Sequence, residues 1–70
     1  MTAGEALHAL EEFVWSEYHR ADAELKRTDE PSTRRKLWER REKMYYWREK
    51  FNLLISDFYE WDLLDHELRS

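Results

Sequence analysis

The sequence predicts an all-α protein, an antiparallel helical hairpin with helices at about residues 3–28 and 32–69. Apolar residues recur at three- and four-residue steps on both sides of one interruption, which is the spacing of amphipathic helices. That interruption, at residues 28–32, contains the only proline, and neither glycine nor proline follows it. Because the connection is short, the two helices must lie side by side and antiparallel.

The first helix carries clear signals at its start. Thr2 followed by Glu5 fits a capping box, in which the hydroxyl and the carboxylate satisfy free amides. Its apolar residues fall within about 80° of a helical wheel, a narrow seam typical of coiled coils. Phe13 and Trp15 stand on opposite shoulders of this seam. The seam consists of Ala3, Leu7, Leu10, Val14, Tyr18, Ala21 and Leu25.

The second helix is predicted to start near Pro31 or Ser32, because proline is well accepted at the first helical position. Positions that face each other across the hairpin should sum to roughly 61–62, which pairs Val14 with Trp47 and Leu10 with Phe51. The main apolar stripe consists of Leu37, Met44, Trp47, Phe51, Leu54, Ile55, Phe58 and Trp61. A second stripe on an adjacent flank consists of Trp38, Tyr45, Tyr59 and Leu63.

The last segment leaves two alternatives open. The second helix either continues to residue 69 or breaks near residues 56–57. Asp57 followed by Glu60 has the spacing of a capping box, so a separate third helix over residues 58–69 could fold back on the hairpin.

Seventy residues form a single domain, and so small a domain buries only about 60% of the surface of its unfolded chain. Small scaffolds depend on disulfides, a metal or oligomerisation, and this chain has no cysteine. We therefore expect a homo-oligomer, with a dimeric helical bundle favoured.

Charged residues make up 40% of the chain, and their order gives alternating blocks. Residues 1–25 carry six acids and one base, residues 26–50 ten bases and five acids, and residues 51–70 five acids and one base. The N-terminus lacks the basic and apolar regions of a signal peptide, and no stretch has the length and apolarity of a membrane span. The sequence thus favours a cytoplasmic protein that does not enter a membrane.

No residues point to catalysis, a cofactor or a metal, and we expect none of the three. The four serines have no histidine and acid arranged in a recognisable motif, and the single glycine, Gly4, excludes a glycine-rich phosphate loop. Glu5 with His8, and Asp62 with His66, have metal-compatible spacings. A metal site needs several inward-facing ligands, however, and His8 lies outside the seam.

The aromatic residues point instead to protein binding. Eight of eleven lie between Trp38 and Trp61, and the first helix has no stripe wide enough to cover them. Exposed aromatic residues are common anchors of protein–protein interfaces. The sequence therefore predicts a self-associating regulatory or inhibitory accessory protein that binds another protein. The predicted partner-binding residues are Trp38, Tyr45, Tyr59, Trp61, Leu64 and Leu68.

The alternative is a nucleic-acid-associated regulator that uses a basic block at residues 34–43. Bases on a helix beside aromatic residues can contact phosphates and stack on nucleobases. Glu39, Glu42 and Glu49 lie among them and oppose this interpretation, as does the net charge of −4. The basic block consists of Arg34, Arg35, Lys36, Arg40, Arg41 and Lys43.

Overall fold

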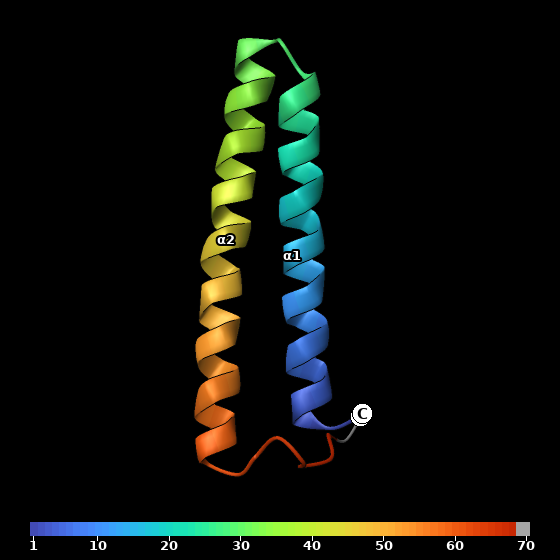
Figure 1. The fold of residues 1–70 in the computed structure, drawn as a ribbon, viewed down its shortest axis with the longest axis vertical. Coiled ribbons are helices and arrows are strands. Elements are labelled where there is room, and N and C mark those ends of the chain that lie inside the picture. Colours follow the sequence, from blue (N-terminus) through green and yellow to red (C-terminus); the bar gives the residue numbers. More distant parts are fainter. Residues whose placement is uncertain (69–70) are drawn as a thin grey trace.

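The computed structural model describes residues 1–68 and shows an all-α hairpin. Helix α1 spans Ala3–Arg27 and helix α2 spans Pro31–Glu60. The two helices run antiparallel and side by side along their whole length (Figure 1). The predicted fold class is confirmed, and the molecule is a flat rod of 47 × 21 × 15 Å.

Helix α2 is shorter than predicted. It ends at Glu60, and residues 61–68 form no further helix, so neither the continuation to residue 69 nor a third helix is present there; residue 69 itself lies outside the described residues. The Leu63 N–H bonds to the Phe58 carbonyl at 2.8 Å, and the Asp62 N–H to that of Tyr59 at 3.1 Å. This is the Schellman pattern of helix termination, with Asp62 in the left-handed position at φ 59°. Aspartate tolerates that conformation better than most residues, so the helix ends without a glycine.

The terminal segment 61–68 closes the open end of the hairpin by capping α1 (Figure 1). The Ala3 N–H donates to the His66 carbonyl at 2.8 Å, and the Gly4 N–H donates to the Leu64 carbonyl at 2.9 Å. The Glu5 N–H donates to the Thr2 hydroxyl at 3.2 Å and the Thr2 N–H donates to the Glu5 carboxylate at 3.1 Å, so the predicted capping box is confirmed. All four free amides of the helix start are therefore bonded.

The closure leaves little room for a side chain at Gly4. A Cβ at this position would lie 3.0 Å from the Leu64 carbonyl oxygen and 3.3 Å from the Leu64 Cβ. The same segment continues past the N-terminus, where Glu67 forms an isolated antiparallel bridge with Thr2 and an ion pair with the N-terminal ammonium. The chain's only glycine thus lies where the terminal segment passes close to the backbone of α1.

The interior between the helices is thin. Ala3, Val14 and Ala21 are its buried apolar residues, all on α1, and no residue of α2, which the structure describes in full, is buried. Residues of α2 that face α1 recur at three- and four-residue steps and are half-buried. They are Leu37, Arg41, Met44, Arg48, Phe51, Asn52, Ile55 and Phe58.

Four residues assigned to the first-helix seam and to the main stripe are exposed instead, namely Leu10, Trp47, Leu54 and Trp61. Arg41 and Arg48 take places in the seam that the apolar pattern did not predict. Arg41 bonds to Asp22 at 2.8 Å, and the Arg48 guanidinium lies 4.1 Å from the ring centre of Trp15. Long side chains can bury their stems while their charge is paired or stacked, so a seam can hold arginine in place of leucine.

The register of the hairpin is close to the predicted one. Asp22 with Arg41, Tyr18 with Tyr45 and Trp15 with Arg48 are contacts whose residue numbers each sum to 63. At the turn, the Arg34 guanidinium donates to the carbonyls of Leu25 and Thr28, each at 2.7 Å. This arginine fastens the start of α2 to the end of α1.

Glu30 caps α2, and this predicts a pH dependence of stability. Its carboxylate accepts from the backbone amides and hydroxyls of Ser32 and Thr33. Bonds from Thr33 first, and then from Ser32, lower the pKa of Glu30 from 4.5 to about 2. Because the folded pKa is depressed, the stabilisation is present above pH 4.5 and is lost as the pH falls through about 2.

We expect Glu30→Gln to lower the free energy of unfolding at pH 7, and the difference from wild type to shrink as the pH falls from 4.5 to 2. Urea titrations of wild type and Glu30→Gln across this pH range measure the difference in the free energy of unfolding. Asp29→Asn is the matched control, since Asp29 is an exposed acid of the same turn. A difference between wild type and Glu30→Gln that does not change with pH would contradict the assigned cap.

Candidate protein-interaction surfaces

The hairpin has two broad flanks, which its ion pairs distinguish. Glu17 and Asp22 are five residues apart, so they point to opposite sides of α1. Glu17, only 8% exposed, bonds to Arg40 at 2.6 Å, and Asp22 bonds to Arg41 at 2.8 Å. The Arg41 guanidinium lowers the pKa of Asp22, and Lys26 adds to this effect. One ion pair therefore crosses the helix interface on each flank.

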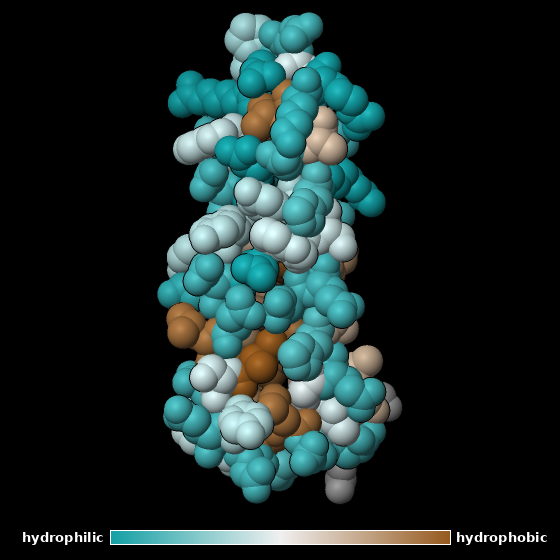
Figure 2. All heavy atoms as spheres, viewed as in Figure 1, coloured by the Kyte–Doolittle hydropathy of each residue, from teal (hydrophilic) through white to brown (hydrophobic). Residues whose placement is uncertain are grey.

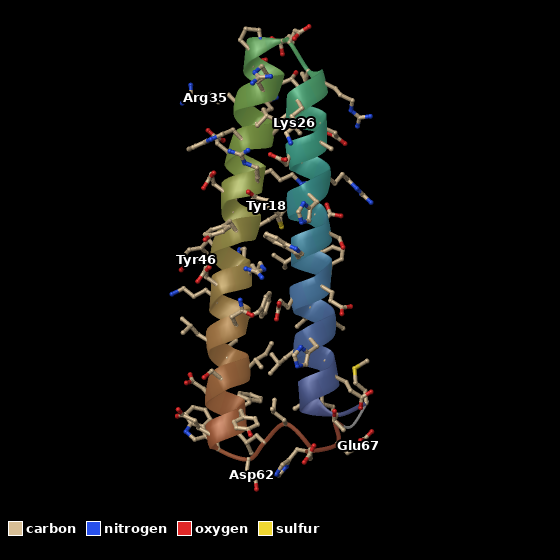
Figure 3. All side chains as sticks on the ribbon, viewed as in Figure 1. Tyr18, Lys26, Arg35, Tyr46, Asp62 and Glu67 are labelled. Atoms are coloured by element: carbon tan, nitrogen blue, oxygen red, sulfur yellow. The ribbon has the colours of Figure 1, made fainter. Side chains whose placement is uncertain are left out.

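The flank of the Asp22–Arg41 pair is named here the tyrosine flank and is defined by Trp15, Trp38, Tyr45 and Tyr59. The last three are spaced at multiples of seven residues, which places them on one side of α2. The Trp15 ring stacks on the Tyr18 ring with centroids 4.8 Å apart, and the centroids of the Tyr18 and Tyr45 rings are 6.1 Å apart. Tyr18 lies between the helices at mid-height (Figure 3). These contacts form an aromatic cluster across the middle of the hairpin.

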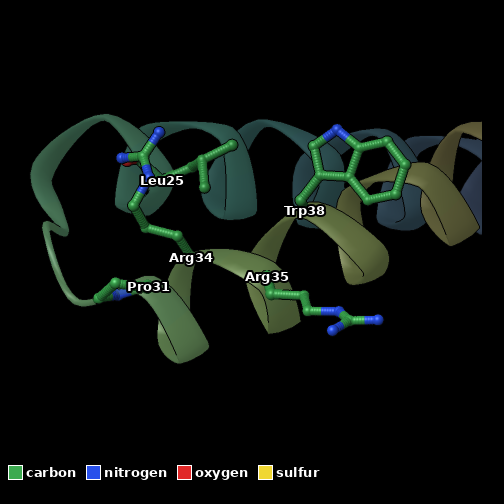
Figure 4. Close-up of a pocket in the computed structure, with 5 residues that line it drawn as sticks. All are labelled: Leu25, Pro31, Arg34, Arg35 and Trp38. Carbon is green, nitrogen blue, oxygen red and sulfur yellow. The ribbon is translucent and has the colours of Figure 1, made fainter.

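A hollow of about 520 Å³ lies beside the turn (Figure 4). Leu25, Pro31 and Trp38 supply its apolar surface, while Arg34 and Arg35 also line it. Trp38 is 51% exposed here. The end of α1 holds Arg34, whereas Arg35 is exposed and its one ion pair with residues 1–68 is a 3.5 Å contact with Glu39. This hollow suits an apolar or aromatic group that carries a nearby negative charge.

The other side is named here the tryptophan flank, and its five residues are all exposed. Trp47, Leu54 and Trp61 repeat every seven residues on the side of α2 that carries Arg40. Trp47 packs on Phe51 with ring centroids 6.2 Å apart, and the rings of Phe58 and Trp61 are 6.3 Å apart. The tryptophan flank consists of Leu10, Phe13, Trp47, Leu54 and Trp61.

The six predicted partner-binding residues do not form one surface. Trp38, Tyr45 and Tyr59 share the tyrosine flank, and Trp61 belongs to the tryptophan flank. Leu64 is half-buried at the closure beneath α1, and Leu68, although exposed, bonds through its N–H to the Met1 carbonyl. Five of the six are exposed, but they face three different directions.

Phe13 and Trp15 were not among the predicted partner-binding residues, and the hollow at the turn was not predicted. The positions of Phe13 and Trp15 on opposite shoulders of the first seam were a usable signal, because each now lies on a different flank. The hollow had no such signal, since Leu25 and Trp38 come together only when the turn brings α1 and α2 into register.

Half of the basic block is engaged within the hairpin. Arg34 caps α1, Arg40 bonds to Glu17 and Arg41 bonds to Asp22. Lys36 and Lys43 form no ion pair with residues 1–68. These contacts leave fewer free cations for phosphates than the sequence count implies.

Apolar side chains also reach the surface between the lower halves of the helices (Figure 2). Within residues 1–68, no three of His, Cys, Asp and Glu are grouped closely enough to hold a metal ion. In the same part of the chain, neither helix has a long enough apolar stretch to cross a bilayer. Comparisons of the chain with models of protein families, with curated proteins and with solved structures find no match.

Proposed function

We propose that this protein is a non-enzymatic protein-interaction module that self-associates and acts as a regulatory or inhibitory accessory protein through its aromatic helical surfaces. One observation carries the proposal: an entire 30-residue helix without a buried residue, in a molecule that exposes large apolar side chains on both flanks. A two-helix hairpin can cover only one stripe of each helix, so the remaining aromatic residues face outward.

The magnitudes support association with protein surfaces. A Trp, Tyr or Phe residue buries roughly 150–250 Å² when fully covered, so three half-exposed rings supply on the order of 300 Å² per flank. This aromatic area is spread along the length of each flank, so a partner that covers the whole flank can bury it. Two flanks of this kind allow one to bind a second copy while the other binds a different protein.

The self-association is tested by sedimentation equilibrium across a micromolar concentration series. We expect a mass of at least twice the 8.8 kDa chain mass, because dimerisation covers aromatic surface that the monomer leaves in water. A folded monomer at all concentrations would contradict the self-association.

Binding of another protein is tested by affinity capture followed by mass spectrometry, with a nuclease-treated sample in parallel. Partners that survive nuclease support the proposal. Their complete loss after nuclease, together with salt-sensitive binding of DNA or RNA in a mobility-shift titration, would replace it with the nucleic-acid function. The variant for that titration is the triple substitution Arg35→Ala, Lys36→Ala and Lys43→Ala, because Arg34 and Arg41 hold the hairpin together.

A further inference from the structure

We infer that a second copy of this chain seats on the tyrosine flank in antiparallel orientation, so that Tyr59 of each copy enters the hollow at the turn of the other. This inference rests on the proposed self-association and specifies its geometry. It is carried by the distribution of charge along the rod, by the position of the hollow, and by the exposure of Tyr59.

The charge of the hairpin changes sign along its length. Residues 15–47, the half nearer the turn, carry nine Lys or Arg and seven Asp or Glu. Residues 1–14 and 48–68, the half nearer the open end, carry two Lys or Arg and nine Asp or Glu. A parallel dimer would place two strongly acidic halves together. An antiparallel dimer places each acidic half beside a weakly basic one, and such complementarity favours one orientation.

Antiparallel, face-to-face packing around a two-fold axis lays α2 of one copy over α2 of the other. The midpoint of α2 lies between Tyr45 and Tyr46. An axis at this midpoint places Arg35 opposite Ser56 and Ser32 opposite Tyr59. Each Tyr59 therefore lies at the Pro31 end of its partner's hollow, and the two Tyr45 rings approach each other near the axis.

The hollow and the group that would fill it match in chemistry. The hollow is apolar and has two arginines in its lining. Tyr59 is the most exposed of the large apolar side chains, at 74%, and it lines a smaller hollow with Asp62 and Asp65. An aromatic ring beside carboxylates fits an apolar hollow beside guanidinium groups. Because the axis makes the contact twice, both hollows are filled in one closed dimer.

The area available is sufficient. The broad face measures 47 by 21 Å, on the order of 1,000 Å² if treated as flat, and a stable interface buries about 800 Å² on each partner. The tryptophan flank is a poorer site for a second copy. Its residues Leu10, Leu54 and Trp61 lie near the open end, so joining two such flanks would bring the two acidic halves together.

The first test compares two tyrosines of α2. Tyr59→Ala is expected to weaken the dimer at least about tenfold, because it removes the ring that enters the hollow. Tyr46→Ala is the matched control, since Tyr46 is exposed on the same helix but points away from the tyrosine flank. An equal effect of the two substitutions on the dimer dissociation constant would contradict the inference.

The second test uses cross-linking, which the absence of cysteine makes specific. One copy carries Arg35→Cys and the other carries Ser56→Cys, with tags of different length, and the two are refolded together. Under mild oxidation we expect the mixed disulfide as the main product. Ser56→Cys alone should give little, because its two copies lie about 30 Å apart in the antiparallel dimer at 1.5 Å per residue. Lys43→Cys mixed with Ser56→Cys is the control for random collision, since Lys43 lies on the side of α2 that faces away from the tyrosine flank.

The outcomes separate the inference from the proposed function. A dimer in sedimentation together with the mixed disulfide supports both. A dimer that instead gives the Ser56→Cys homodisulfide brings its two α2 helices together in parallel, and a dimer that gives no disulfide above the Lys43→Cys control has another face or another orientation. Either result overturns the inference and leaves self-association intact. A monomer in sedimentation overturns both.

Discussion

Phe51→Ala is expected to lower the free energy of unfolding by about 2–3 kcal/mol. A fully buried phenylalanine costs about 3–5 kcal/mol on truncation, and Phe51 is half-buried in the seam of α2, so part of that loss applies. A core of this size supplies no more than about 3–5 kcal/mol in total. The substitution should therefore remove most of the stability of the hairpin.

Urea unfolding followed by circular dichroism measures this loss, at one protein concentration because self-association also stabilises the fold. Tyr46→Ala is the control, since it truncates an exposed aromatic residue of the same helix. Its effect should stay within about 0.5 kcal/mol, as for surface substitutions generally. If both variants lose the same free energy, Phe51 does not belong to the hairpin core.

Gly4→Val should release the terminal segment 61–68 from α1 and lower the free energy of unfolding by about 1–3 kcal/mol, the usual cost of overpacking. Any Cβ at residue 4 meets the Leu64 carbonyl oxygen at 3.0 Å, and valine adds two methyl groups to that contact. The segment must then move away, and the amides of residues 3 and 4 lose their acceptors, His66 and Leu64.

Hydrogen exchange reports this release directly, because the amides of residues 3 and 4 should lose protection while those in the middle of α1 keep theirs. Ala9→Val is the matched control, since it places the same side chain at an exposed site of α1. Unchanged protection of residues 3 and 4 in Gly4→Val would show that the closure tolerates a side chain there.

The sequence alone determined the two helices, the capping box that starts the first one and their antiparallel order, because each of these depends on nearby residues. Thr2 with Glu5 defines the start of α1, Pro31 fixes the start of α2, and the apolar period requires helices. The sequence also indicated that aromatic residues would remain exposed, because the apolar stripe of the first helix is too narrow to cover those of the second. Trp38, Tyr45 and Tyr59 were correctly placed on one side of the second helix, because they are spaced at multiples of seven residues.

Only the tertiary structure decided how the chain ends and which residues fill the seam. Helix α2 ends at Glu60 because Asp62 adopts a left-handed conformation, which no glycine announces. The closure also depends on Gly4, 60 residues earlier in the chain than Leu64. The side of α2 that faces α1 includes Arg41 and Arg48, which are half-buried there because each finds a partner on α1. Trp47 and Trp61 remain outside, because contacts between distant residues, and not hydrophobicity alone, decide which side chains are covered.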